Sequence, residues 1–387
     1  FLPPSLDANI ASAGSLEKGT ALTANLDFDK YESWLVKLNQ AQTTPQKTAQ
    51  QKASQQNVQP MILDVSWKNI DRAMPYIGWL DSDEGQVNLA LVEGKQDIHV
   101  ATNVRTHEQA TLPAGQYEAR LNLKDNILNV PAFTYQSLQK GSLSGQAKVE
   151  LPSEKRQLKW NAILNAKDFN PQTITTAAPV NLLNGEIKAN GYAKPNQQII
   201  QFDAISLKGR MANSTQNEMI ELTGKSTAAI VFHDEKSGGG FKGFAVRYDG
   251  GLNAFNQGKG LLKFNISGTP DFIKIAELQH NGVAGKIFAS GSVNLKNAIG
   301  WDINASLVRF KPQYFVSSVK GELSGNLKTQ GLWAENSKRI NIEKLNMAGF
   351  LNNKVVRGTG NLSMIVNSNQ KGFLPQQFEA NNLFLAY

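Results

Sequence analysis

The stretch "WDINASLVRFKP" (Trp301–Pro312) determines how we interpret the rest of the chain. Its apolar residues alternate with polar ones, which is the pattern of a β-strand with one apolar and one polar face. The alternation ends at Phe-Lys-Pro, and proline cannot donate a hydrogen bond to a sheet. A second copy, "WNAILNAKDFNP" (Trp160–Pro171), begins 141 residues earlier, and in both copies Phe follows Trp by nine residues and Pro by eleven. The repeat predicts that the same kind of strand is used more than once.

Alternation of period two also dominates outside these two copies. Examples are "QVNLALV" (Gln86–Val92), "GEIKANG" (Gly185–Gly191) and "GLLKFNISG" (Gly260–Gly268). Clusters of Gly, Asn, Asp and Pro interrupt the alternation at intervals of about 8–12 residues, as in all-β proteins. The sequence therefore predicts an all-β protein with a mainly antiparallel sheet, one face of which is apolar.

Helix signals are few. Tyr31, Trp34, Leu35 and Leu38 recur at helical spacing and predict a helix over Asp29–Gln42. Proline at a first helical turn indicates a second helix over Pro270–His280.

The organisation along the chain follows from these signals. We expect a β segment ending in a helix over residues 1–40 and a Gln-rich flexible linker or loop over 41–60. A β-sheet segment then covers residues 61–140, and repeated β-hairpins cover residues 141–387. The sequence begins without Met and ends on the apolar alternation "NNLFLAY", so we expect a piece of a longer protein.

Composition excludes several classes of protein. The 387 residues are 41% hydrophobic and 19% charged, which excludes a wholly disordered chain. No run reaches the roughly 20 apolar residues of a membrane-spanning helix. The absence of cysteine rules out disulfides and thiolate metal sites. The net charge is +8, but the basic residues are scattered without a basic run, so we expect no nucleic-acid partner.

Catalytic motifs are also missing. "TGKST" (Thr223–Thr227) lacks the first glycine of a phosphate-binding loop, because that position is Met219. The four histidines are dispersed, and there is no Gly-x-Ser-x-Gly motif. We therefore expect no enzyme activity, no cofactor and no metal site.

The apolar face of the strands is the remaining candidate for function. It is carried by alternate residues of the Trp strands and of the strand that follows the second copy: Trp160, Ala162, Leu164, Trp301, Ile303, Ala305, Leu307, Leu323 and Leu327. One interpretation is a closed core, formed by two packed sheets or a barrel. The other is a curved sheet whose apolar face lines an open groove. The sequence predicts few helices to cover so much sheet, but composition alone does not choose between the two.

A looser repeat links these elements to a known family. The pattern "G-x-(V/L)-x-L … W-x-(I/A)-x-x-x-x-x-x-F-x-P … G-E-(I/L)" occurs at Gly291–Leu323 and, with longer gaps, at Gly141–Ile187. "KLNMAGFLNNKVVRGTGNLSM" (Lys344–Met364) has a strand, a turn and a second "G-x-G-x-L" strand. Over residues 140–387 the chain resembles the AsmA-like superfamily of Gram-negative envelope proteins, and within it most closely the TamB family.

The resemblance implies a fold and a function. The fold is a β-taco, a long curved antiparallel sheet folded lengthwise around an apolar groove, with few short helices. The function implied is a non-enzymatic periplasmic bridge that carries phospholipid between the inner and outer membranes, with the nine residues above in the groove. Phospholipids are one implied partner, and a BamA-like outer-membrane barrel, TamA, is another. Inner-membrane anchoring would use segments missing from this sequence.

Two alternatives stay open from the sequence. The chain could be a scaffold that acts with the BamA-like barrel in the assembly of outer-membrane proteins and autotransporters, through strand addition to its sheet. It could also be a structural protein with a closed β-solenoid core.

Overall fold

The protein is built almost entirely of β-strands. The computed structural model describes residues 6–15, 19–28, 32–40, 61–74, 78–92, 94–106, 112–153, 157–176, 178–194, 196–212, 219–233, 240–254, 259–314, 318–334, 337–367 and 377–386. Within these ranges there are 22 strands, two 3-10 helices and no α-helix. The chain divides into two compact units, Phe1–Glu186 and Ile187–Tyr387, with the boundary inside β11 (Val180–Lys194). We describe each unit separately.

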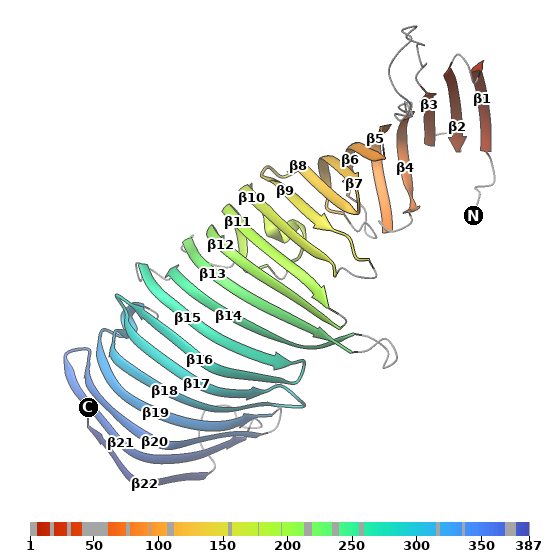
Figure 1. Ribbon diagram of the computed structural model, residues 1–387. Coiled ribbons are helices and arrows are strands. Elements are labelled where there is room, and N and C mark those ends of the chain that lie inside the picture. Colours follow the sequence, from red (N-terminus) through yellow and green to blue (C-terminus); the bar gives the residue numbers. More distant parts are fainter. Residues whose placement is uncertain are drawn as a thin grey trace. The chain divides into compact units, whose positions relative to one another are not determined.

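Unit 1 is an open antiparallel sheet in which each strand from β1 to β10 pairs with the next one in sequence. The strands follow one another in chain order in Figure 1. They are β1 (Leu6–Ser15), β2 (Gly19–Phe28), β3 (Glu32–Gln40), β4 (Met61–Met74), β5 (Gly78–Val92), β6 (Lys95–Val104), β7 (Gly115–Lys124), β8 (Ile127–Ser137), β9 (Ser142–Glu150) and β10 (Lys159–Phe169).

Unit 2 repeats this meander from β12 to β22, again with antiparallel pairing between sequence neighbours. The strands are β12 (Gln197–Met211), β13 (Met219–Phe232), β14 (Phe241–Asn253), β15 (Lys259–Thr269), β16 (Phe272–Gly282), β17 (Gly285–Asn294), β18 (Ile299–Phe310), β19 (Gly321–Trp333), β20 (Ser337–Leu351), β21 (Lys354–Asn367) and β22 (Gln377–Ala386).

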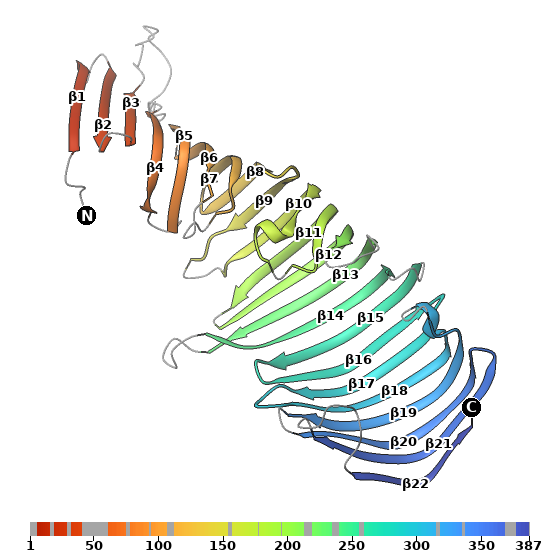
Figure 2. The same cartoon turned by 180° about the vertical axis from the view of Figure 1, so that it is seen from behind.

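The strands of unit 2 are bent, so that its sheet has a concave side (Figures 1 and 2). Shifts in the pairing register mark the bends, for example between Ile275 and Leu278 in β16 and between Ile342 and Leu345 in β20. Such β-bulges insert extra residues into one strand of a pair and increase its bend and twist. Among the described residues β22 pairs only with β21, so unit 2 does not close into a barrel. The predicted all-β, curved, open antiparallel sheet is confirmed.

Both helix predictions are wrong. Glu32–Gln40 of the first predicted helix is β3, and Phe272–Gly282, which covers most of the second, is β16. In β3 the residues Trp34, Val36 and Leu38 alternate and pair with apolar residues of β4, so a strand buries more of them than a helix would. The predicted linker 41–60 lies outside the described residues, and the domain boundaries drawn from the repeat remain predictions.

The two copies of the Trp motif form matching structures. Both are strands, β10 and β18, and in both the residue before the phenylalanine has a positive φ: 48° at Asp168 and 52° at Arg309. Each copy then continues into a 3-10 helix that begins at the motif proline, η1 (Pro171–Thr173) and η3 (Pro312–Tyr314). The repeat predicted from the sequence is therefore a structural repeat. No helix among the described residues is long and apolar enough to cross a membrane.

Candidate functional site: the apolar face

In each unit the pairing register of the strands places apolar side chains on the same side of the sheet. Residues directly opposite each other in an antiparallel pair share a face. The apolar face of unit 2 is the side that carries the following residues: Ile200, Phe202, Ile205, Leu207, Ile220, Leu222, Ala228, Ile230, Phe244, Val246, Tyr248, Leu262, Phe264, Ile266, Ile273, Ile275, Leu278, His280, Ile287, Ala289, Val293, Trp301, Ile303, Ala305, Leu307, Leu323, Leu327, Ile340, Ile342, Leu345, Met347, Val356, Leu362 and Met364. The other side, the polar face, is rich in Lys, Asn, Ser and Glu.

Six of the predicted site residues lie together on the apolar face of unit 2. Trp301, Ile303, Ala305 and Leu307 follow one another along β18. On β19, Leu327 is directly opposite Ala305, and Leu323 is opposite the phenylalanine that ends β18. The structure therefore brings these six residues onto one face of two neighbouring strands.

The other three predicted residues lie in unit 1. Trp160, Ala162 and Leu164 alternate along β10 and stand opposite Val149, Ala147 and Gly145 of β9. The apolar face of unit 1 is the side that carries the following residues: Leu22, Ala24, Leu26, Trp34, Val36, Leu38, Leu63, Val65, Trp67, Val87, Leu89, Leu91, Ile98, Val100, Tyr117, Ala119, Leu123, Leu128, Val130, Phe133, Tyr135, Leu143, Ala147, Val149, Trp160, Ala162 and Leu164.

Within the described residues, no second layer covers most of this apolar surface. Of the nine predicted residues none is buried: eight are half-buried, and Leu164 is 38% exposed. In a sandwich or barrel, inward side chains of central strands are buried. The closed-core interpretation therefore does not fit the described residues.

Two tryptophans lie flat against the apolar face because a glycine stands opposite each of them. Trp301 pairs with Gly331, and a Cβ on that glycine would lie 2.0 Å from the Trp301 ring. Trp67 pairs in the same way with Gly85, where a Cβ would lie 2.2 Å from the ring. A glycine thus makes room for an aromatic ring that covers the neighbouring backbone, as aromatic residues do over strand glycines elsewhere.

One end of the strands in unit 1 is closed by a compact cluster. Trp67, Ile70, Leu80 and Val104 are buried together, and Trp34 packs on them with its ring 5.6 Å from that of Trp67. The indole Nε1 of Trp67 donates a buried hydrogen bond of 3.1 Å to the Oγ of Ser82, which fixes the ring orientation. This cluster packs one end of the strands of unit 1, next to the exposed apolar face.

Polar atoms on the apolar face are mostly satisfied locally. The hydroxyl of Tyr135 donates to the carbonyl of Ala114 at 2.9 Å, and that of Tyr248 to the carbonyl of Thr223 at 2.9 Å. Burial raises the pKa of Tyr117 and Tyr248 above the ordinary tyrosine value, so both are neutral at physiological pH. His280 is the exception: it is 8% exposed, its Nε2 has no hydrogen-bond partner, and burial lowers its pKa.

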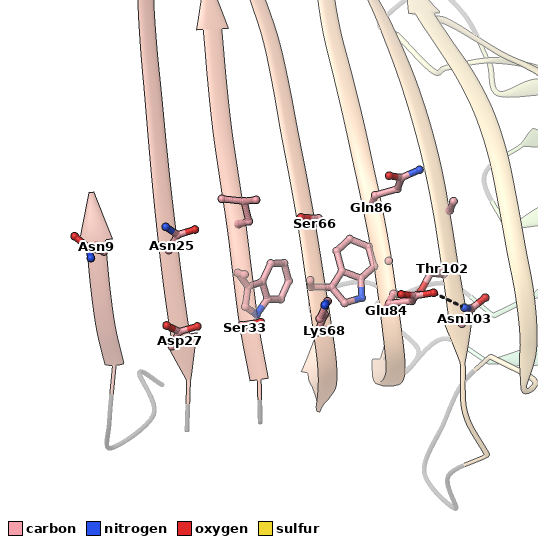
Figure 3. Close-up of a pocket in the computed structure, with 15 residues that line it drawn as sticks. Asn9, Asn25, Asp27, Ser33, Ser66, Lys68, Glu84, Gln86, Thr102 and Asn103 are labelled. Atoms are coloured by element: carbon pink, nitrogen blue, oxygen red, sulfur yellow. Dashed lines mark hydrogen bonds between the residues drawn. The ribbon is translucent and has the colours of Figure 1, made fainter. Parts of the chain in front are cut away.

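The polar face of unit 1 has a depression of about 810 Å³. Asp27, Ser33, Lys68, Glu84 and Asn103 stand in one row across its strands (Figure 3). The amide of Asn103 donates to a Glu84 carboxylate oxygen at 3.2 Å. No group of three or more potential metal ligands occurs among the residues the structure describes. This row is therefore a polar surface that carries charges of both signs.

Part of the apolar face was not predicted from the sequence. Trp34 was placed in a helix, and Trp67 with its facing Gly85 was not identified. The same period-two alternation marks both tryptophans, but the facing glycine depends on a strand register that connects distant parts of the sequence.

Comparison with known protein families gives a match for unit 2. Residues 219–385 match the family model described as the TamB N-terminal domain. The matched region runs from the first residue of β13 into β22, so it lies inside unit 2 and covers somewhat less than half of the chain. No curated protein and no solved structure gave a match. The predicted resemblance to the TamB family is confirmed for this region.

Proposed function

We propose that this TamB-like chain is part of a non-enzymatic bridge that carries phospholipid along its apolar face, between the inner and outer membranes of a Gram-negative bacterium. The observation that supports the proposal is an apolar face that runs through the strands of each unit and is left uncovered. Large exposed apolar surfaces on soluble proteins mark binding sites, because leaving them in water is unfavourable.

Free energy of transfer explains why such a surface suits lipid. Exposing one acyl CH₂ group to water costs about 0.8 kcal/mol, so a lipid with two chains exposes on the order of 20 kcal/mol. A lipid that crosses an aqueous space needs apolar contact at every step, without one deep pocket that would trap it. A meander in which each strand presents similar residues supplies such contact step by step.

In this proposal Trp160, Ala162, Leu164, Trp301, Ile303, Ala305, Leu307, Leu323 and Leu327 contact acyl chains. The head groups remain in water at the strand ends. The periplasm is the proposed location, and a BamA-like barrel such as TamA is the proposed partner at the outer membrane. The resemblance of unit 2 to the TamB family supports both assignments.

Native mass spectrometry of the purified chain tests the proposal. We expect phospholipid to co-purify with the wild type and to be lost from Ile303→Asp, which puts a charge on the apolar face. The matched control is Asn304→Asp, one residue further along β18 and exposed on the polar face. A folded wild type without lipid, or equal lipid in both variants, would contradict the proposal and favour the scaffold for outer-membrane proteins.

A further inference from the structure

The strands β18–β21 form an apolar lane with a lysine at each end. Among the described residues of these strands, no acidic side chain lies on the apolar face. The basic residues on that face are Lys338, at the start of β20, and Lys354, at the start of β21. Antiparallel pairing puts these two strand starts at opposite ends of the lane. Every other position between them is apolar, glycine or threonine.

The Lys338 end of the lane is also built of aromatic and aliphatic side chains. Ile299, Trp333 and Lys338 are directly opposite one another on β18, β19 and β20. The Nζ of Lys338 lies over the Trp333 ring, 4.2 Å from its centroid. Trp333 is 42% exposed and Ile299 is 50% exposed, so this row is open to solvent. We call these three residues the Trp333 rim.

A tryptophan and a lysine at the end of an apolar strip are the arrangement found where proteins meet the head-group level of a membrane. The indole has an apolar body with a polar N–H, and the lysine keeps its stem on apolar surface while its ammonium stays in water. A cation–π contact of this kind holds the ammonium in place without removing its charge. The Trp333 rim therefore places a lysine ammonium where the apolar surface ends.

The length of the lane fits one acyl chain that starts at this rim. The nine residues from Ile299 to Leu307 span roughly 26 Å, because the eight steps between them rise about 3.3 Å each. A lipid chain in one leaflet extends about 15 Å, half of a hydrocarbon core of ~30 Å. An acyl chain can therefore lie along β18 and β19, over Trp301, Ile303 and Ala305, while its phosphate stays at the rim.

We propose that the Trp333 rim is a binding site for the phosphodiester of a phospholipid, with the Lys338 ammonium as its anion-binding group and the acyl chain running along the strands. This inference rests on the proposed function and adds the site and orientation of the bound lipid. Charge-assisted hydrogen bonds between an ammonium and a phosphate oxygen are stronger than neutral ones, and an exposed one weakens with salt.

The test compares two lipids that share their acyl chains. Binding of dioleoylphosphatidylglycerol and of dioleoylglycerol, which has no phosphate, is measured on the full chain by native mass spectrometry. We expect the wild type to prefer the phospholipid about fivefold, the effect of one lysine beside an anionic head group. Lys338→Gln should lose that preference and keep its affinity for dioleoylglycerol, which also shows that it is folded, while Lys338→Arg should restore it. The matched control is Lys344→Gln, an exposed lysine on the polar face of the same strand.

The outcomes distinguish a failure of the rim assignment from a failure of the proposed function. If neither lipid binds the wild type, lipid carrying itself is wrong. If both bind and Lys338→Gln leaves their ratio unchanged, lipid carrying stands and the rim assignment is overturned. Glycerol 3-phosphate, which has no acyl chain, should not compete with the phospholipid at millimolar concentration. Equal competition would mean a site for free phosphate, and would also overturn the assignment.

Discussion

The contact between Trp301 and Gly331 leads to a quantitative prediction about stability. A Cβ at position 331 would lie 2.0–2.5 Å from three atoms of the Trp301 ring, closer than side-chain carbons can approach. Gly331→Ala must therefore move the ring off the sheet, which also breaks the hydrogen bond of 3.3 Å from its Nε1 to Thr329. Overpacking of this kind costs typically 1–3 kcal/mol.

Gly300→Ala is the matched control, because it adds the same methyl group one residue before Trp301 on the polar face. Its nearest neighbours would lie 3.7 Å away, which is ordinary contact. There alanine should be neutral or stabilise by about 0.5 kcal/mol, since it reduces the freedom of the unfolded chain. The two alanine variants should thus differ by about 2 kcal/mol in local stability, which is roughly a 30-fold difference in an equilibrium constant.

Amide hydrogen exchange over β18 and β19 measures that difference directly. Local measurement is needed because a long meander need not unfold as one cooperative unit. We expect about 30-fold faster exchange in Gly331→Ala than in Gly300→Ala, with strands of unit 1 unchanged. Equal exchange in the two variants would refute the packing of the Trp301 ring on Gly331.

Two further predictions concern charged groups. Arg105→Met should destabilise unit 1 by about 2 kcal/mol, because it leaves the nearly buried carboxylate of Asp81 without its ion pair. Lys95→Met breaks the exposed pair with Asp97 and should cost less than about 0.5 kcal/mol. Urea titration of both variants measures the two losses, and equal losses would contradict this reasoning. Because burial lowers the pKa of His280, the unfolded chain takes up its proton at a higher pH than the folded chain does. The stability from neutral His280 is thus complete above about pH 6.5 and falls on acidification, so the urea midpoint should drop more between pH 7.5 and 5.5 in the wild type than in His280→Gln. An equal drop would show that other groups cause it.

Strand alternation was the most informative signal in the sequence. Because side chains of a strand point to opposite faces in turn, the spacing of Trp301, Ile303, Ala305 and Leu307 was enough to place them on one face. The same argument placed Trp160, Ala162 and Leu164 correctly relative to one another. Both copies of the motif also contain the proline that starts a 3-10 helix.

The helix predictions failed where two periods overlap. Trp34, Leu35 and Leu38 satisfy helical spacing, but Trp34, Val36 and Leu38 also alternate, and nine residues are too few to separate the two patterns. The pairing of Trp34 with Trp67 and of Leu38 with Leu63 decides for the strand. That pairing joins residues on either side of a polar segment, so local sequence does not contain it.

The open apolar face could not be predicted from composition. A closed core and an open groove require the same alternation, and they differ only in whether a second layer covers the strands. Leu164, Ile299 and Trp333 are exposed, so no second layer covers the strands at these residues. The pairing of tryptophan with a facing glycine likewise needed the register between β18 and β19.

Photo-crosslinking at neighbouring residues tests most directly whether the apolar face holds lipid. A benzophenone amino acid is placed at Ile303 or at Asn304, and separately at Leu327 or at Asn326, in cells that express the chain with its natural partners. In each pair the first residue lies on the apolar face and the second on the polar face. We predict phospholipid adducts at Ile303 and Leu327 and none at Asn304 and Asn326. Adducts of equal yield on both faces, or protein adducts alone at Ile303 and Leu327, would contradict the lipid-carrying account.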